Sequence, residues 1–125
     1  MFPMPTKQKF LILFVLPILY LLPACSPTNQ AAGYFPPSAR ARITCIIQRE
    51  SGGNPAAISP TQDYGLLQIN RAAHATNFYN RYHLSFTRYA LTVKYNALYG
   101  RYLYDYYRRA GGSGFEPWAG GRYAC

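Results

Sequence analysis

The chain has 125 residues, which leaves room for one small domain and excludes an assembly of several. It carries 13 Lys or Arg residues but only four Asp or Glu residues, for a net charge of +9. A basic surface attracts any polyanion, whether nucleic acid, anionic lipid or an acidic cell wall, and it also serves solubility. Charge alone therefore does not select a partner.

The first 24 residues have the layout of a secretory signal. Lys7 and Lys9 precede the apolar run FLILFVLPILYLLPA (10–24), and no acidic residue accompanies them. The run is short for a membrane-spanning helix, which needs about 20 apolar residues, and Pro17 and Pro23 interrupt it. We predict an exported protein whose mature part has a net charge of +7, because removing the two lysines lowers the charge by two. An uncleaved anchor is the alternative.

The signal ends in Leu22-Pro23-Ala24-Cys25, which resembles a bacterial lipobox. This resemblance implies that Cys25 is lipidated and becomes the mature N-terminus, whereas the alternative is an ordinary cleavage site beside a cysteine. We then expect a periplasmic, lipid-anchored protein, with residues 25–37 as a polar tether. If the host is Gram-negative, Ser26 after the cysteine implies sorting to the outer membrane.

Three cysteines leave one over from any pair. If Cys25 carries lipid, Cys45 and Cys125 remain, and an exported protein can oxidise them to a disulfide. A loop of this length is worth about 4 kcal/mol in the chain-entropy model, which matters to a small domain. Two free buried thiols are the alternative.

Helices dominate the predicted domain, which spans residues 38–125. The first helix should begin at Ser38, a good N-cap, and stop at Gly52-Gly53, since glycine favours the left-handed cap. One apolar stripe of this helix contains Ile43, Ile46, Ile47 and Glu50. The stripe places Glu50 on the apolar side, near the helix end.

The remaining segments are less regular, apart from one long predicted helix. Residues 54–64 are loop-like, although a small hairpin in this stretch is an alternative. GLLQIN (65–70) starts a new element. Residues 86–109 predict a long helix, and its tyrosines recur at helical spacing: Tyr95, Tyr99, Tyr102 and Tyr106. We expect this stripe to pack inward as core rather than to form a sugar platform. The fold class is therefore mainly α.

Glu50 is the carboxylate whose placement suggests chemistry. A carboxylic acid that stays protonated in an apolar setting can donate a proton to a leaving oxygen, as glycoside cleavage requires. The surrounding residues are Glu50-Ser51, Asn54-Pro55, Ser59-Pro60 and GLLQI (65–69). In this order and without gaps, they resemble the catalytic segment of the soluble lytic transglycosylases of the lysozyme-like superfamily.

The resemblance implies a small lysozyme-like helical domain that cleaves peptidoglycan strands. It implies that Glu50 acts as general acid and then general base, and that Ser59 and Gln68 hydrogen-bond the sugar. Tyr64 and Asn70 would help shape the cleft. The structural alternatives for Ser59 and Gln68 are a turn cap and a buried amide.

Two features depart from the family pattern. Leu67 replaces the usual Met, and the C-terminal Ala-Tyr-Asn-Ala-Gly motif is missing, with Pro117-Trp118 and Cys125 in its place. This leaves open which aromatic side chains line the cleft. Trp118 could stack on sugar or be buried in the core.

Asp63 has a competing interpretation. The stretch DYGLLQIN (63–70) also resembles animal-type lysozymes, in which this Asp is the second carboxylate. Retaining hydrolysis needs two carboxyl groups about 5 Å apart, whereas the resemblance to lytic transglycosylases implies a single one. The short linker from Glu50 to Asp63 favours the transglycosylase. Asp63 is then a loop residue that bonds its own backbone.

We predict no metal site and no cofactor. His74 and His83 lack metal-ligand spacing with other side chains, and no phosphate-binding glycine loop is present. The expected partner is the peptidoglycan strand, with a membrane contact through the lipid, and the chain should be a monomer. A nucleic-acid binder lacks a recognised motif, whereas a non-catalytic wall-binding module is a competing interpretation.

Overall fold

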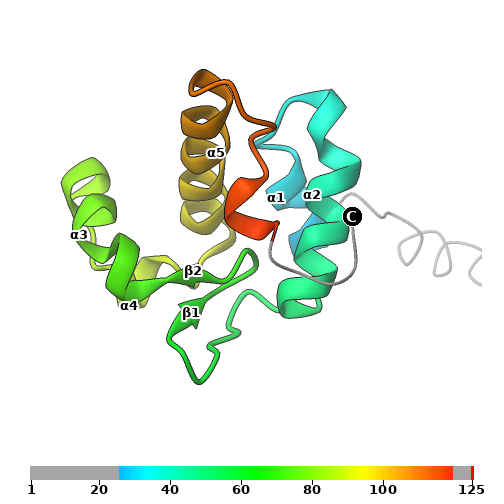
Figure 1. Ribbon diagram of the computed structural model, residues 1–125. Helices are drawn as coiled ribbons and strands as arrows, with labels where there is room; N and C mark the ends of the chain where they lie inside the picture. Colours follow the sequence, from blue (N-terminus) through cyan, green and yellow to red (C-terminus); the bar gives the residue numbers. More distant parts are fainter. Residues whose placement is uncertain (1–25, 120–124) are drawn as a thin grey trace, which may run out of the picture.

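The computed structural model describes residues 26–119 and 125 and is mainly helical, as predicted (Figure 1). The predicted signal and the Cys25 lipidation site lie outside the described residues. The helices are α1 (Pro27–Ala32), α2 (Pro37–Ser51), α3 (Arg71–Tyr82), α4 (Phe86–Tyr89), α5 (Val93–Arg109) and the 3₁₀-helix η3 (Glu116–Trp118). Strands β1 (Asp63–Tyr64) and β2 (Ile69–Asn70) form an antiparallel hairpin.

The tether predicted over residues 25–37 is wrong for most of its length. The side chain of Ser26 caps α1 by accepting a hydrogen bond from the backbone N–H of Asn29 (3.1 Å), and Pro27 occupies the first turn, where proline is tolerated. The helix packs against both α2 and α5. Ala31, Ala32 and Phe35 are buried in the core, so the folded unit includes this segment.

Helix α2 agrees closely with its prediction. It begins at Pro37, one residue before Ser38, and Gly52 ends it in the left-handed conformation (φ 62°). A residue with a side chain is strained at such a φ, which is why glycine stands here. The isoleucines of its predicted stripe, Ile43, Ile46 and Ile47, are all buried. The glycine cap places Glu50 in the last turn of the helix.

The single long helix predicted over residues 86–109 is instead two helices. Helix α4 stops at Tyr89, and α5 begins at Val93, with the Thr92 side chain accepting from the backbone N–H of Tyr95 (3.3 Å). The carbonyl of Ala90 accepts a hydrogen bond from the Asn96 side chain (2.8 Å). A threonine side chain can bond backbone N–H groups in this way at the start of a helix, so a new helix begins after Thr92. The pattern of apolar residues continues across this break, which is why it predicted a single helix.

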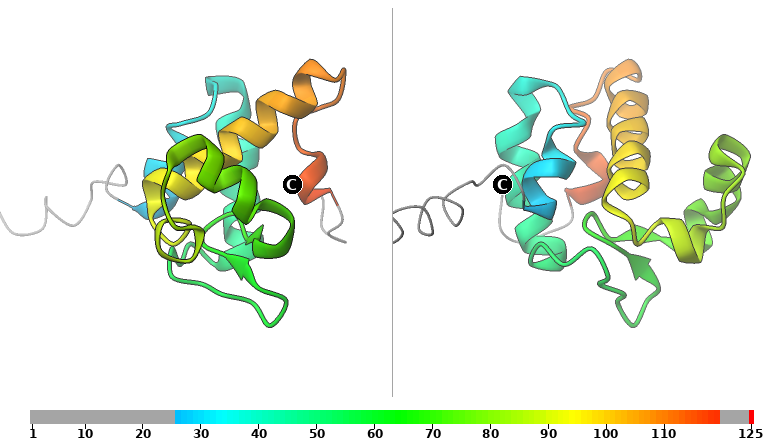
Figure 2. Two further views of the ribbon diagram at one scale, coloured as in Figure 1. Left: turned by 90° about the vertical axis from the view of Figure 1, so that its left-hand side faces the viewer. Right: turned by 180° about the vertical axis from the view of Figure 1, so that it is seen from behind.

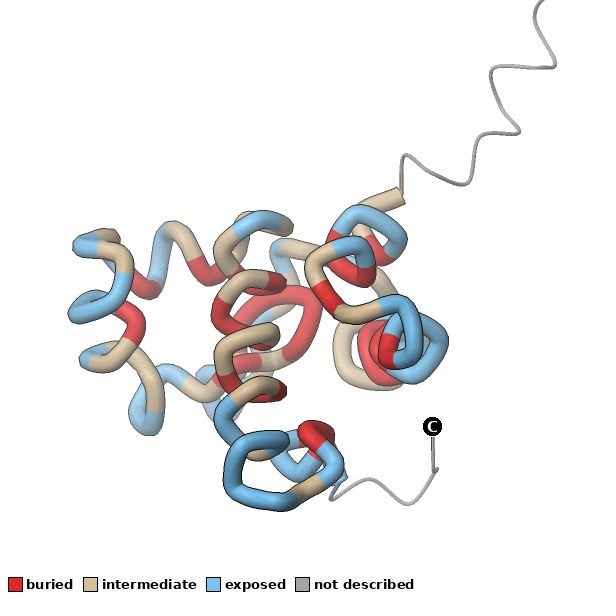
Figure 3. Tube along the Cα trace, turned by 90° about the horizontal axis from the view of Figure 1, so that it is seen from above, coloured by how far each residue is buried: buried red, intermediate tan, exposed pale blue. Residues whose placement is uncertain are grey.

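Helix α5 runs through the middle of the molecule, between α3 and α4 on one side and α1 and α2 on the other (Figures 1 and 2). Buried residues gather on the faces where these elements meet (Figure 3). The predicted tyrosine stripe divides along α5. Tyr99 is fully buried, as expected of core, whereas Tyr106 is 53% exposed.

The side chain of Asn96, itself 1% exposed, locks the hairpin onto α5. Its amide nitrogen donates to the carbonyls of Tyr64 (2.9 Å) and Ala90 (2.8 Å), and its oxygen accepts from the N–H of Leu67 (2.9 Å). Gly65 adopts φ 75°, and a Cβ there would collide with the Asn96 amide. The turn between the two strands is therefore fixed by a helix beneath it.

The predicted disulfide is confirmed. Cys45 bonds to Cys125 across 80 residues, with their Cα atoms 5.5 Å apart. The bridge holds residue 125 against α2, five residues before Glu50. No helix within residues 26–119 is long and apolar enough to span a membrane.

Replacing Asn96 should destabilise the fold strongly. In Asn96→Ala, the N–H of Leu67 and the carbonyls of Tyr64 and Ala90 lose their buried partner, at about 1–3 kcal/mol for each unsatisfied group. We expect the free energy of unfolding to fall by at least about 3 kcal/mol, measured by urea denaturation. Asn80→Ala, at an exposed position of α3, is the matched control and should change little. Equal stability of the two variants would contradict the role of Asn96.

Candidate functional site

Glu50 lies at the C-terminal end of α2, and its side chain is 28% exposed. Its Oε1 accepts from Arg49 through Nη2 (2.9 Å) and Nε (3.3 Å). The neighbouring stripe residues are buried, as predicted, but the carboxylate itself is partly open and paired. Glu50 therefore sits at the edge of the apolar face rather than within it.

The β-hairpin gathers the other predicted site residues on one element. In its register Asp63 pairs with Asn70, and Tyr64 pairs with Ile69. The preceding loop folds back so that the N–H of Ser59 donates to the carbonyl of Asp63 (3.0 Å). Residues that are up to 11 positions apart in the sequence thus lie side by side.

Both oxygens of the Asp63 carboxylate are occupied by neighbours. Oδ2 accepts from the hydroxyls of Ser59 (2.7 Å) and Thr61, and Oδ1 accepts from the amide of Asn70 (2.9 Å). Partial burial opposes ionisation, but these hydrogen bonds outweigh it and hold the pKa of the Asp63 carboxyl below its usual value. Asp63 is thus an ionised group that stabilises its own hairpin.

Ser59 and Gln68 both bond to the hairpin and its preceding loop, but Gln68 is only partly buried and so differs from the buried amide of the structural alternative. The hydroxyl of Ser59 is engaged with Asp63 and accepts from the backbone N–H of that residue (3.1 Å). The amide nitrogen of Gln68 donates to the carbonyls of Gly65 (2.9 Å) and Ala57 (3.3 Å). Within residues 26–119 and 125 nothing donates to Oε1 of Gln68. That oxygen is available to a ligand, and the sugar contacts stay predictions.

Tyr64 and Asn70 serve the hairpin and its junction with α3. Tyr64 is 6% exposed, its ring packs edge-on against Phe86 (5.2 Å between centroids), and its hydroxyl donates to Gln62 (3.1 Å). Asn70 caps α3, because its side-chain oxygen accepts from the N–H of Ala73 (3.1 Å). Their contact with a substrate remains a prediction.

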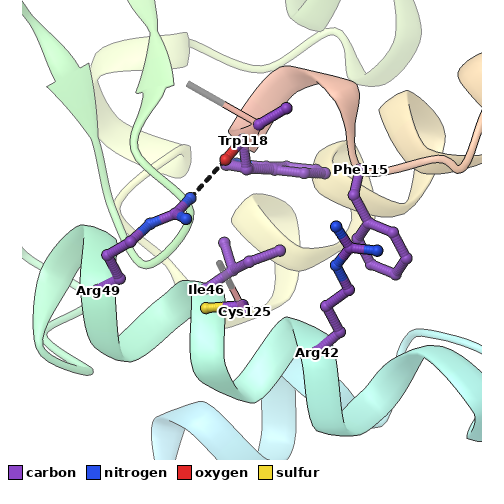
Figure 4. A pocket seen from close by; sticks show the side chains of 7 residues that line it. Arg42, Ile46, Arg49, Phe115, Trp118 and Cys125 are labelled. Carbon is purple, nitrogen blue, oxygen red and sulfur yellow. Dashed lines mark hydrogen bonds between the residues drawn. The ribbon is translucent and has the colours of Figure 1, made fainter. Parts of the chain in front are cut away.

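Sequence reasoning missed the link that Arg49 makes between Glu50 and the C-terminal segment. The indole N–H of Trp118 donates to the carbonyl of Leu67 (2.9 Å), so the only tryptophan is core. The backbone carbonyl of the same residue accepts from Nη2 of Arg49 (2.5 Å), as Figure 4 shows. An arginine directly before the candidate acid was the one signal available.

A cavity of about 120 Å³ lies between α2 and η3 and is lined in part by Arg49, whereas Glu50 does not line it. In the wall of this cavity, the guanidinium of Arg42 stacks over the ring of Phe115 (4.3 Å to the ring centroid). The residues lining the cavity are Arg42, Ile46, Arg49, Phe115, Trp118, Ala119 and Cys125 (Figure 4). This cavity is too small for a glycan strand and does not contain the candidate acid.

A second hollow, of about 250 Å³, runs between α3 and α5. The hydroxyl of Tyr99 at its base contacts Nδ1 of His74 (3.0 Å) and accepts from the amide of Asn77 (3.1 Å). Burial lowers the pKa of His74. The residues lining this groove are His74, Asn77, Tyr99, Tyr102, Leu103, Tyr106 and Tyr107. We call it the tyrosine groove.

A family model described as the transglycosylase SLT domain matches residues 28–120. The chain belongs to this family. None of the curated proteins and none of the solved structures compared with the chain matches it. The matched range covers α1 except its first residue and includes the β-hairpin and η3, so the family match extends well beyond the segment around Glu50.

Membership of the SLT family supports a role of the lytic transglycosylase type, acting on peptidoglycan. It confirms the family inferred from the segment between Glu50 and Ile69. Over the part of the chain that the structure describes, no group of three His, Cys, Asp or Glu side chains could hold a metal ion.

The SLT hairpin should lose stability in acid because of Asp63. Its pKa is lower in the folded state than the reference value of 3.8, so its contribution to stability is complete above that pH and disappears as the pH falls through the folded pKa. We expect the melting temperature to fall from about pH 5 downwards, and Asp63→Asn to flatten this part of the curve. Parallel curves for the variant and the wild type would contradict the hydrogen-bonded role of Asp63.

Proposed function

We propose that this SLT domain is a lytic transglycosylase that breaks the β-1,4 bond between MurNAc and GlcNAc, with Glu50 as its only catalytic carboxylate. The observation that carries the proposal is the contrast between two carboxylates. Asp63 has hydrogen bonds on both oxygens, whereas Oε2 of Glu50 has none within the described residues. Glu50 thus has an oxygen left to transfer a proton.

In the proposed reaction, Glu50 in its protonated form donates a proton to the glycosidic oxygen. The bond between C1 of MurNAc and that oxygen then breaks, and the GlcNAc end leaves with the proton. The Glu50 carboxylate next removes the proton of the MurNAc C6 hydroxyl, whose oxygen attacks C1. This step closes a 1,6-anhydro ring and returns Glu50 to its protonated form, so no second carboxylate is needed.

Substrate contacts follow from the same arrangement. Ser59 and Oε1 of Gln68 would accept hydrogen bonds from the sugar beside the cleaved bond. The tyrosine groove supports a role in holding the strand, because aromatic faces such as those of Tyr102 and Tyr106 stack on sugar rings. The basic charge of the chain suits an acidic wall.

The cellular setting is part of the proposal. The positive, apolar N-terminal segment and Cys25 support an exported, lipid-anchored protein in the periplasm, facing the wall from the membrane, and we propose that it is a monomer. In a Gram-negative host, Ser26 supports anchoring in the outer membrane.

Glu50→Gln should remove activity without removing the fold. We expect the wild-type chain to clear a peptidoglycan suspension and the variant to be slower by at least about 100-fold, the range for a lost general acid. Asp105→Asn, which removes the carboxylate of a half-exposed ion pair with Arg101 on α5, is the control and should keep its activity. Near-full activity of Glu50→Gln would reject the assignment. Wild-type protein that sediments with the wall but releases nothing would indicate a binding module.

A hydrolase using Glu50 and Asp63 is the second candidate, because Asp63 is held ionised by its hydrogen bonds in a partly open setting. A lysozyme's second carboxylate has this kind of environment. Mass spectrometry of the released fragments separates the two. Anhydro-muramic ends, with Asp63→Asn still active, would support the transglycosylase. Reducing ends, lost in Asp63→Asn, would mean that water attacks and Asp63 is catalytic.

A further inference from the structure

We infer that Arg49 is a positioning residue for Glu50, tying one oxygen of the carboxylate to the C-terminal 3₁₀-helix and leaving the other for proton transfer. The inference rests on the proposed function, since it concerns how the acid is held. In this role Arg49 acts through its contacts with Glu50, so its effect on the reaction is indirect.

The contact is not an automatic result of sequence proximity. Adjacent residues of an α-helix point about 100° apart, so their side chains do not face each other. Yet Nη2 and Nε of Arg49 both reach Oε1 of Glu50, at 2.9 and 3.3 Å. The guanidinium must therefore turn back along the helix surface, which costs side-chain entropy that contacts with other groups must offset.

One group that provides such a contact is the carbonyl of Trp118, which accepts from Nη2 of Arg49 (2.5 Å). Trp118 is itself fixed, because its indole donates to the carbonyl of Leu67 and its side chain is buried. The Arg49 side chain is 20% exposed, which places it between water and the core. One guanidinium thus joins the end of α2 to η3, and through η3 to the hairpin turn.

The two Glu50 oxygens consequently differ. Oε1 receives both donors from Arg49, while Oε2 has no hydrogen-bond partner among residues 26–119 and 125. The planar fork of the guanidinium restricts the carboxylate more than a lysine ammonium could, because it presents several donors in fixed directions. Arg49 therefore sets the direction in which Oε2 delivers its proton.

The kinetic test uses Arg49→Gln and soluble glycan strands as substrate. We expect kcat to fall by about 10- to 100-fold, the scale on which a misplaced catalytic group lowers a rate, with KM little changed. Arg49→Lys should recover part of the loss, because an ammonium replaces the charge but not the fork. Arg42→Gln, on the same helix and lining the same cavity without a contact to Glu50, should act like the wild type.

A second test does not depend on activity. In the wild type, the Arg49 side-chain Nε–H should give a slowly exchanging NMR resonance that Glu50→Gln shifts and Asp105→Asn does not. If the wild type releases no fragments, the proposed function fails, and this resonance still decides whether Arg49 holds Glu50. An unchanged resonance in Glu50→Gln, or wild-type kcat in a folded Arg49→Gln, would overturn the inference.

Discussion

The described structure depends first on the buried amide of Asn96. A two-stranded hairpin of two-residue strands is marginal by itself, since it has too little backbone pairing and no sheet to join. Here the missing pairing comes from a helix, because one side chain on α5 bonds three backbone groups of the loop above it. The turn that carries Gln68 and follows Asp63 therefore inherits the rigidity of α5.

From this point the restraints run in sequence towards Glu50. The N–H of Leu67 donates to the Asn96 side chain, and the carbonyl of Leu67 accepts from the indole of Trp118. The carbonyl of Trp118 in turn accepts from Arg49. Each link joins residues that are at least 29 positions apart in the sequence. Contacts with the middle and the end of the chain thus position the candidate acid and the hairpin, although Glu50 and the hairpin lie close together in the sequence.

What the sequence predicted well were features decided by local chemistry. The isoleucine stripe and Gly52 fixed the course of α2, and the count of cysteines led to the Cys45–Cys125 bridge. The family motif between Glu50 and Ile69 could be recognised from the spacing of its residues alone.

What it could not predict depends on burial or on distant partners. Helix α1 is six residues of largely polar sequence, and only its packing on α2 and α5 shows it to be structure rather than tether. The break before α5 depends on the bond between Asn96 and Ala90, which no periodicity contains. The sequence could not decide whether Trp118 belongs to the core or forms a sugar platform, since an isolated aromatic residue fits both roles until the partner of its indole is known.

The disulfide has a topological consequence. By closing the chain between Cys45 and Cys125, it makes a covalent ring that contains Glu50, the hairpin and α5, while α1 lies outside the ring. A protease that cuts a loop within the ring opens it without separating the pieces. Tension between the N-terminal side and Cys125 passes through α1, the first turns of α2 and the disulfide, so it bypasses the residues that hold the carboxylate.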